Sequence, residues 1–136
     1  MRYFRFEKLV IWQRSVETAR KIFKLADLLE ERRLFRFADQ MRGAGLSLPN
    51  NIAEGSGSTS KREFIQFLNF ARRSTFEIAS MLMIFAKEGL IPENKKEEII
   101  QELDELCRMI TALSRTLSGG DKKPDKANPV REKGTP

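Results

Sequence analysis

Few side chains in this sequence could carry out catalysis. The chain has no histidine and a single cysteine, Cys107. Histidine is the most common general base and the most common zinc ligand, so its absence excludes a nucleophile–base pair and a zinc cluster in their usual forms. We interpret Cys107 as a structural thiol, and with no second cysteine the chain cannot form an internal disulfide.

Carboxylates are the next candidates, and three of them, Glu98, Glu102 and Glu105, recur at helical spacing. A di-metal site in a helical bundle needs Glu-x-x-His pairs, which this chain cannot supply. Because lysines lie nearby, we predict that these carboxylates are solvated surface charge. The segment Gly55-Ser56-Gly57-Ser58 lacks the Gly-x-x-x-x-Gly-Lys-Ser/Thr spacing of a phosphate loop and is interpreted as a turn. We therefore expect a protein without enzymatic activity, metal or other cofactor.

Anion binding is the chemistry that the sequence favours. The net charge is +6 and it is uneven, since residues 1–76 carry +7 and residues 77–118 carry −3. Many of the positive side chains are arginines, whose planar guanidinium suits phosphate. No known DNA- or RNA-reading motif is present, so binding would use the phosphate backbone with little sequence specificity. An ordinary solvated surface is the alternative interpretation.

The predicted nucleic-acid contacts are basic residues of the first three helical segments: Arg14, Arg20, Lys21, Lys24, Arg36, Arg42, Lys61, Arg62, Arg72 and Arg73. Among them, Arg14, Lys21, Arg72 and Arg73 are the main candidates for contacts with the phosphate backbone. The start of the third segment, at residues 60–62, also presents free backbone N–H groups beside positive side chains, where a phosphate could bind.

Four helical segments must hold these side chains in place. They cover about residues 7–29, 35–54, 60–88 and 92–118, and short turns separate them. Alternating spacings of three and four place apolar residues on one stripe of a helix. The predicted stripes are Leu9, Trp12, Val16, Ala19, Phe23 and Ala26 in the first segment, Phe64, Leu68, Ala71, Thr75, Ile78, Leu82 and Phe85 in the third, and Ile99, Leu103, Leu106, Ile110, Leu113 and Leu117 in the fourth.

This pattern predicts an all-α fold, an antiparallel up-down four-helix bundle that spans residues 1–118. Residues 119–136 contain three of the five prolines and few apolar side chains. We predict that they form a disordered basic C-terminal tail, because such a segment cannot bury enough surface to offset the entropy of ordering.

Local signals refine the helix boundaries. Ser60 precedes Glu63 by three residues, the spacing of a capping box at the start of the third segment. In the second segment, Gly43, Gly45 and Pro49 interrupt the helical period. We predict a kink near residues 45–49, because proline removes one backbone hydrogen bond, and we expect the small residues to admit a neighbouring helix.

The third segment is more apolar than a single core stripe requires. Exposed aromatic and aliphatic side chains of this number would favour association, because burying them removes apolar surface from water. Leu25 and Leu28 also lie outside the predicted stripe of the first segment and favour the same interpretation. The alternative is a broad core that uses them all. The predicted oligomer interface is Phe67, Phe70, Phe76, Met81 and Ile84.

No apolar run in the sequence reaches the roughly 18 residues needed to span a bilayer. The N-terminus, residues 1–8, carries an acidic residue and lacks the apolar stretch of a signal peptide. We therefore expect a cytoplasmic protein without a membrane partner.

The most distinctive segment is residues 40–55, QMRGAGLSLPNNIAEG. Together with LVIWQ at residues 9–13 and FIQFL at residues 64–68, it resembles the four-helix-bundle proteins encoded in intervening sequences of bacterial 23S ribosomal RNA genes. The resemblance covers about residues 9–117. The same family includes the accessory variability determinants of diversity-generating retroelements. The residues that match the family motif, which we interpret as structural, are Pro49, Asn51, Ile52, Ala53, Glu54 and Gly55.

The resemblance implies a ring-shaped homopentamer. For the retroelement relatives it also implies a basic surface that binds RNA or DNA and a reverse transcriptase. The alternative that it leaves is a protein–protein adaptor or scaffold encoded in a ribosomal RNA intervening sequence. Within the motif, we expect Asn51 to brace the chain around Pro49 and Glu54 to pair with a nearby arginine.

Overall fold

The computed structural model describes residues 4–119, and within that range every regular element is a helix. A short 3-10 helix, η1 (Arg5–Lys8), precedes α1 (Val10–Glu31), α2 (Phe35–Ser56), α3 (Lys61–Lys87) and α4 (Glu93–Leu117). The predicted tail, residues 119–136, lies outside the described residues apart from Gly119. The all-α prediction is confirmed for the described part of the chain.

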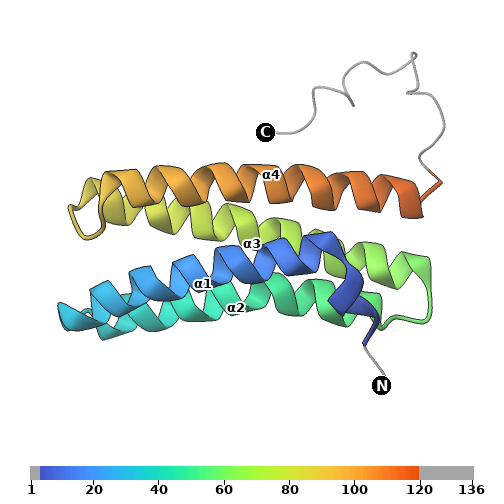
Figure 1. Cartoon of the computed structure of the whole chain (residues 1–136), viewed down its shortest axis with the longest axis horizontal. Coiled ribbons are helices and arrows are strands. Elements are labelled where there is room, and N and C mark those ends of the chain that lie inside the picture. The colour runs from blue at the N-terminus through green and yellow to red at the C-terminus, as the bar shows by residue number, and fades with distance from the viewer. Residues whose placement is uncertain (1–3, 120–136) are drawn as a thin grey trace, which may run out of the picture.

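The four long helices lie side by side along one axis, and the chain reverses direction at each of the three turns between them (Figure 1). Helix α1 contacts α2 and α4, and α3 contacts α2 and α4. The N-terminal segment and the α2–α3 turn lie at one end of the bundle, and the other two turns lie at the opposite end (Figure 1). This arrangement decides which charged residues meet.

The predicted stripes of α3 and α4 are largely correct. Leu68, Ile78 and Leu82 of α3 are fully buried, and Leu106 and Ile110 of α4 lie against them in the same hydrophobic core. Alternating spacings of three and four therefore identified the faces that meet at the centre of the bundle.

The predicted stripe of α1 was correct only in part: Ala19 and Ala26 are buried as predicted, but the centre of the buried face lies one position earlier in the chain. The buried residues Ile11, Ser15, Thr18, Ile22, Leu25 and Leu29 keep the spacing of four and three. Two of these positions are polar, so a count of apolar residues selected the neighbouring stripe. The Ser15 hydroxyl donates to the Trp12 carbonyl at 2.7 Å and the Thr18 hydroxyl to a Glu102 carboxylate oxygen at 3.1 Å. These bonds offset the cost of burying both hydroxyls.

Helix α2 continues through Pro49, and small residues bring it close to its neighbours. A Cβ on Gly45 would lie 3.0 Å from Cγ2 of Ile22, so this glycine admits α1, whereas Gly43 faces open space. The Asn51 amide donates to the Ser47 carbonyl at 2.9 Å and to its hydroxyl at 3.0 Å. Asn51 therefore braces the helix on both sides of Pro49, as predicted.

Two helix starts agree with the sequence signals in outline. The Ser60 hydroxyl accepts the backbone N–H of Glu63 at 3.1 Å, which caps α3. Pro92 directly precedes α4, and Glu93 lies in the first turn of that helix. None of the described helices combines the length and the hydropathy that crossing a membrane requires.

The turn between α1 and α2 contains a strained arginine. Arg33 has a φ of 64°, in the left-handed region that disfavours residues with a Cβ. The backbone N–H of Arg33 donates to the Glu30 carbonyl, and the backbone N–H of Leu34 donates to the Leu29 carbonyl. Hydrogen bonds of this kind close the C-terminus of a helix, where the left-handed position is usually a glycine.

We expect Arg33→Gly to raise the free energy of unfolding by up to about 1 kcal/mol, because glycine relieves this strain. Arg36→Gly, a matched change inside α2, should lower it by about 1 kcal/mol. Urea denaturation followed by circular dichroism measures both. A loss of stability in Arg33→Gly would contradict the prediction.

Candidate nucleic-acid interface

Two of the main predicted phosphate contacts form ion pairs between α1 and α4. Arg14 pairs with Glu105, and Lys21 pairs with both Glu98 and Glu102. The hydrogen bond from Lys21 to Glu102 raises the pKa of the lysine above its ordinary value of 10.5. The three carboxylates, predicted to be solvated surface charge, are therefore the partners that join α4 to α1. Their charge compensates that of Arg14 and Lys21 and makes this seam a poor place for phosphate.

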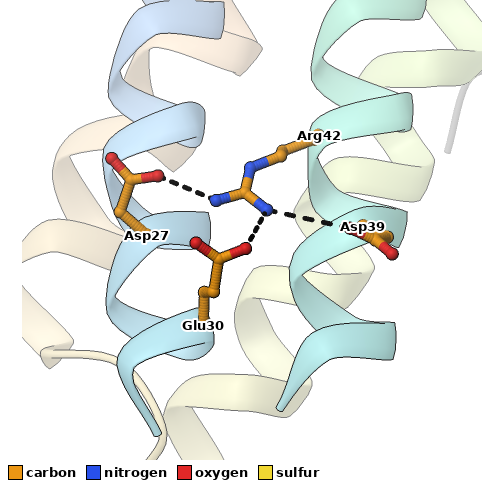
Figure 2. A network of polar contacts seen from close by, with 4 residues as sticks. All are labelled: Asp27, Glu30, Asp39 and Arg42. Carbon is orange, nitrogen blue, oxygen red and sulfur yellow. Dashed lines mark hydrogen bonds and ion pairs between the residues drawn. The ribbon is translucent and has the colours of Figure 1, made fainter. Parts of the chain in front are cut away.

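Arg42 is held in the same way between α1 and α2 (Figure 2). Its guanidinium lies 2.9 Å from Asp27, 3.0 Å from Glu30 and 3.7 Å from Asp39. Hydrogen bonds to Asp27 and then Glu30 raise the pKa of Arg42 above its ordinary range. With three carboxylates around one guanidinium, the local charge is negative. The structure gives Arg42 the role of linking two helices.

The remaining predicted contacts are less constrained. Arg20 forms only a 3.4 Å ion pair with Glu17, which lies three residues earlier on the same exposed face of α1. Within residues 4–119, six of the predicted cations have no carboxylate within ion-pair distance: Lys24, Arg36, Lys61, Arg62, Arg72 and Arg73. The last four belong to α3, so this helix carries most of the predicted contacts that have no carboxylate partner.

A groove between α3 and α4 gathers some of these arginines with others from α4. Its volume is about 920 Å³, and a second hollow of about 550 Å³ lies along the same two helices. Arg62 and Arg72 come from the first half of α3, and Arg108 and Arg115 come from the second half of α4. Asp104, which pairs with Arg108 at 3.2 Å, is the one carboxylate among the residues that line the two hollows. We call Arg62, Arg72, Arg108 and Arg115 the basic half of the groove.

The other part of the groove is lined mostly by apolar side chains, with Thr75 and Ser80 among them. Phe76, Met83 and Ile84 of α3 line it and are 46%, 49% and 54% exposed. Ile100 of α4 lies on the other side. We call these four residues the apolar half of the groove. Arg72 lies at the junction, with its guanidinium 5.1 Å from the centre of the Phe76 ring.

One residue of the predicted oligomer interface, and one further residue interpreted as surplus apolar surface, belong to the core. Met81 is only 7% exposed and belongs to the core, because it faces inward beside Leu82. Leu25 of α1, also interpreted as surplus apolar surface, is 3% exposed and belongs to the core as well. Phe67 is half-buried and packs against Gly55, whereas Phe70 is exposed.

The motif at residues 49–55 has a structural role in most of its positions. Ile52 is fully buried in the core. Gly55 lies directly against α3, next to Phe64 and Phe67. The expected pairing of Glu54 with an arginine was wrong: among residues 4–119 no basic group lies within ion-pair distance of this exposed carboxylate.

Sequence reasoning missed Arg108 and Arg115. They lie in the part of the chain with negative net charge, so the overall balance hid them. Their spacing of seven residues places both on the same face of a helix, and this signal could have identified them. The partner groups across the groove could not be identified in this way, because they depend on how α3 and α4 pack.

The groove offers side chains that suit the binding of a ligand. Within the described residues, no three side chains of the His, Cys, Asp and Glu types lie together as metal ligands would. Cys107 lines the groove and is half-buried. Arginines beside an open apolar surface can bind phosphate and bury a partner's apolar side chains.

The helices, the core and the basic groove define an all-α protein built around four long helices. The model of the family described as 23S rRNA-intervening sequence protein matches residues 7–112, and the chain belongs to this family. The chain is also similar to a protein of unknown function from the S23 ribosomal protein family of Bacteroides thetaiotaomicron VPI-5482, known from a 1.70 Å crystal structure. The two are 25% identical, with a TM-score of 0.74, over 78% of this chain and 99% of that one. No curated protein matches the chain in sequence.

Proposed function

We propose that this chain is a cytoplasmic, non-enzymatic accessory protein that binds RNA or DNA and associates with copies of itself, as a homopentamer. The observation that carries the proposal is the division of the α3–α4 groove into a basic half and an apolar half. The basic half supplies guanidinium groups for the phosphate backbone, and the apolar half supplies surface for self-association.

The pattern of compensated and uncompensated charge supports the position of this interface. A cation that already pairs with a carboxylate must lose that partner before it can bind phosphate, whereas an uncompensated arginine only loses water and counterions. Arg14, Lys21 and Arg42 are of the first kind. Arg62, Arg72 and Arg115 have no carboxylate within ion-pair distance among residues 4–119, so we place phosphate contacts there.

Replacing Arg62, Arg72 and Arg115 together by glutamine is expected to weaken binding of single-stranded RNA by about one to two orders of magnitude at low salt. Three lost phosphate contacts should also reduce the slope of log affinity against log salt by about 2. Fluorescence anisotropy over a salt series measures both quantities.

The matched control replaces Arg14, Lys21 and Arg42 by glutamine, which removes the same net charge. We expect this triple variant to keep most of the affinity, because those cations are already compensated. Circular dichroism must show that both variants remain helical. An equal loss of affinity in the two variants would mean that net charge alone governs binding, and no binding by the unchanged protein would refute the nucleic-acid role.

Self-association has its own support and test. Phe76, Met83 and Ile84 would leave large apolar side chains exposed to water in an isolated chain. We expect light scattering of the unchanged protein to give a mass near five times 15.7 kDa. Ile84→Asp should shift it toward the monomer, because a carboxylate buried in an apolar interface loses its hydration. Lys87→Asp, one turn away on an exposed site, is the control, and a monomeric unchanged protein would refute the proposal.

A second candidate function is that of a protein adaptor, which the apolar half of the groove also favours. In that case the main partner is another protein, and the reverse transcriptase of a diversity-generating retroelement is the partner that the family resemblance implies. A pull-down that survives nuclease treatment and fails with Ile84→Asp would favour the adaptor. A pull-down that nuclease abolishes would favour the nucleic-acid role.

A further inference from the structure

Three aromatic side chains, Phe4, Phe6 and Trp12, pack in a row where the described chain begins. We call these three residues the aromatic hook. The carboxylate of Glu7 accepts the backbone N–H of Phe4 at 2.8 Å, and the Gln13 amide donates to the Glu7 carbonyl at 2.7 Å. These two bonds join the hook to itself and to the first turn of α1. Phe4 therefore occupies a defined position although it makes little contact with the core.

The three rings of the hook lie in sequence. Phe4 stacks on Phe6 with ring centres 5.6 Å apart and planes 15° from parallel. Phe6 in turn packs against Trp12 at 4.9 Å, tilted by 55°. The outermost ring, Phe4, is 73% exposed. The near-parallel stack thus ends in a ring that is open to solvent. An exposed aromatic ring does not gain the free energy that its burial would provide.

Positive side chains lie close to Phe4 in the sequence and at the same end of the bundle. Arg5 and Lys8 are exposed, and within the described part of the chain neither has a carboxylate at ion-pair distance. Lys61 and Arg62, at the start of α3, lie at the same end of the bundle (Figure 1). Glu54 and Glu63 at this end offset part of the charge. The local charge is therefore modest, and a ligand held here would need a contact other than phosphate attraction.

We infer that Phe4 is a stacking platform for a base of single-stranded nucleic acid, with Arg5 and Lys8 contacting the adjoining phosphates. The inference rests on the proposed nucleic-acid role and gives it a site separate from the groove. A flat exposed ring accepts any base on its π-face, and each such stack contributes about 1–3 kcal/mol. Duplex nucleic acid, whose bases are already stacked, cannot use the platform.

Trp12 is the only tryptophan in the chain, and its indole packs against Phe6, so its fluorescence reports on this site. The probes are a short oligothymidylate and an abasic oligodeoxynucleotide of the same length, which carries the same phosphates without bases. The variants are Phe4→Ala, which removes the platform, and Phe4→Leu, which keeps an apolar side chain without the ring. Phe35→Ala removes another exposed ring at the opposite end of the bundle and is the control.

We expect oligothymidylate to change the Trp12 fluorescence of the full chain. Phe4→Ala and Phe4→Leu should each weaken its binding about 5- to 100-fold, as expected for the loss of one stacked base. Binding of the abasic strand should stay unchanged, and Phe35→Ala should affect neither probe. Retention of helix by circular dichroism shows that the variants fold.

Different results overturn different claims. If the unchanged protein binds oligothymidylate and Phe4→Ala binds it equally well, the platform is refuted and the proposed nucleic-acid role stands. An equal loss for the abasic strand also refutes stacking. If neither strand binds at low salt, both proposals fall. A Trp12 response to phosphatidylserine vesicles, but not to oligothymidylate, would make the hook a membrane contact and refute the inference.

Discussion

Leu25→Ala is expected to lower the free energy of unfolding by about 2–5 kcal/mol, the range for removing a fully buried leucine side chain. Leu25 is 3% exposed and lies in the core beside Ile22 and Leu29. The loss combines the transfer free energy of the removed carbons with the cost of the cavity that they leave. Urea denaturation followed by circular dichroism measures it.

Leu28→Ala is the matched control three residues further along α1. Leu28 is 39% exposed, and its truncation should cost about 1 kcal/mol or less, because much of the side chain already contacts water. Both variants must be compared at one protomer concentration, since self-association links stability to concentration. Equal costs at the two positions would show that the buried face of α1 is not the one described above.

Gly55→Ala is expected to destabilise the protein by about 1–3 kcal/mol through overpacking. A Cβ at this position would lie 2.8 Å from Cβ of Phe67 and 2.9 Å from Cδ1 of Phe64. The second atom belongs to a ring that can turn aside, but the first is fixed to the backbone of α3. The two helices would therefore have to move apart along their whole contact.

Gly43→Ala, on the same helix, should have the opposite sign. No atom lies within 4 Å of a Cβ built there, so alanine adds helix propensity without a clash. We expect a gain of about 0.5–1 kcal/mol. Denaturant midpoints of the two variants, at equal slope, test both predictions. A stabilising Gly55→Ala would mean that α2 and α3 lie further apart at this point.

These contrasts also bear on the family motif. Ile52 and Gly55 are buried and Asn51 braces the helix around Pro49, so most of the motif maintains the packing of α2 against its neighbours. The motif therefore identifies the fold and says little about a ligand. The proposed ligand binding rests instead on arginines of α3 and α4, outside the motif.

The nucleic-acid role inferred from the sequence stays a prediction, and the structure bears only on how the predicted cations are paired. Ten basic residues were predicted to contact nucleic acid, and the three that the structure compensates most completely, Arg14, Lys21 and Arg42, each meet a carboxylate from another helix. Their partners Glu105, Glu102 and Glu30 are distant from them in sequence. Residue types and spacing within one helix contain no information about such contacts.

The sequence alone determined the number of helices, their approximate ends and the core faces of α3 and α4. These features depend on local rules, namely helical periodicity, the Ser60 cap and the glycine and proline positions, which act within a few residues. It located the buried face of α1 only in part, because Ser15 and Thr18 occupy core positions only where backbone and cross-helix partners satisfy their hydroxyls. Tertiary structure also decided which arginines stay uncompensated. The physical reason is that an ion pair depends on distances between helices, and those distances are set when the core closes.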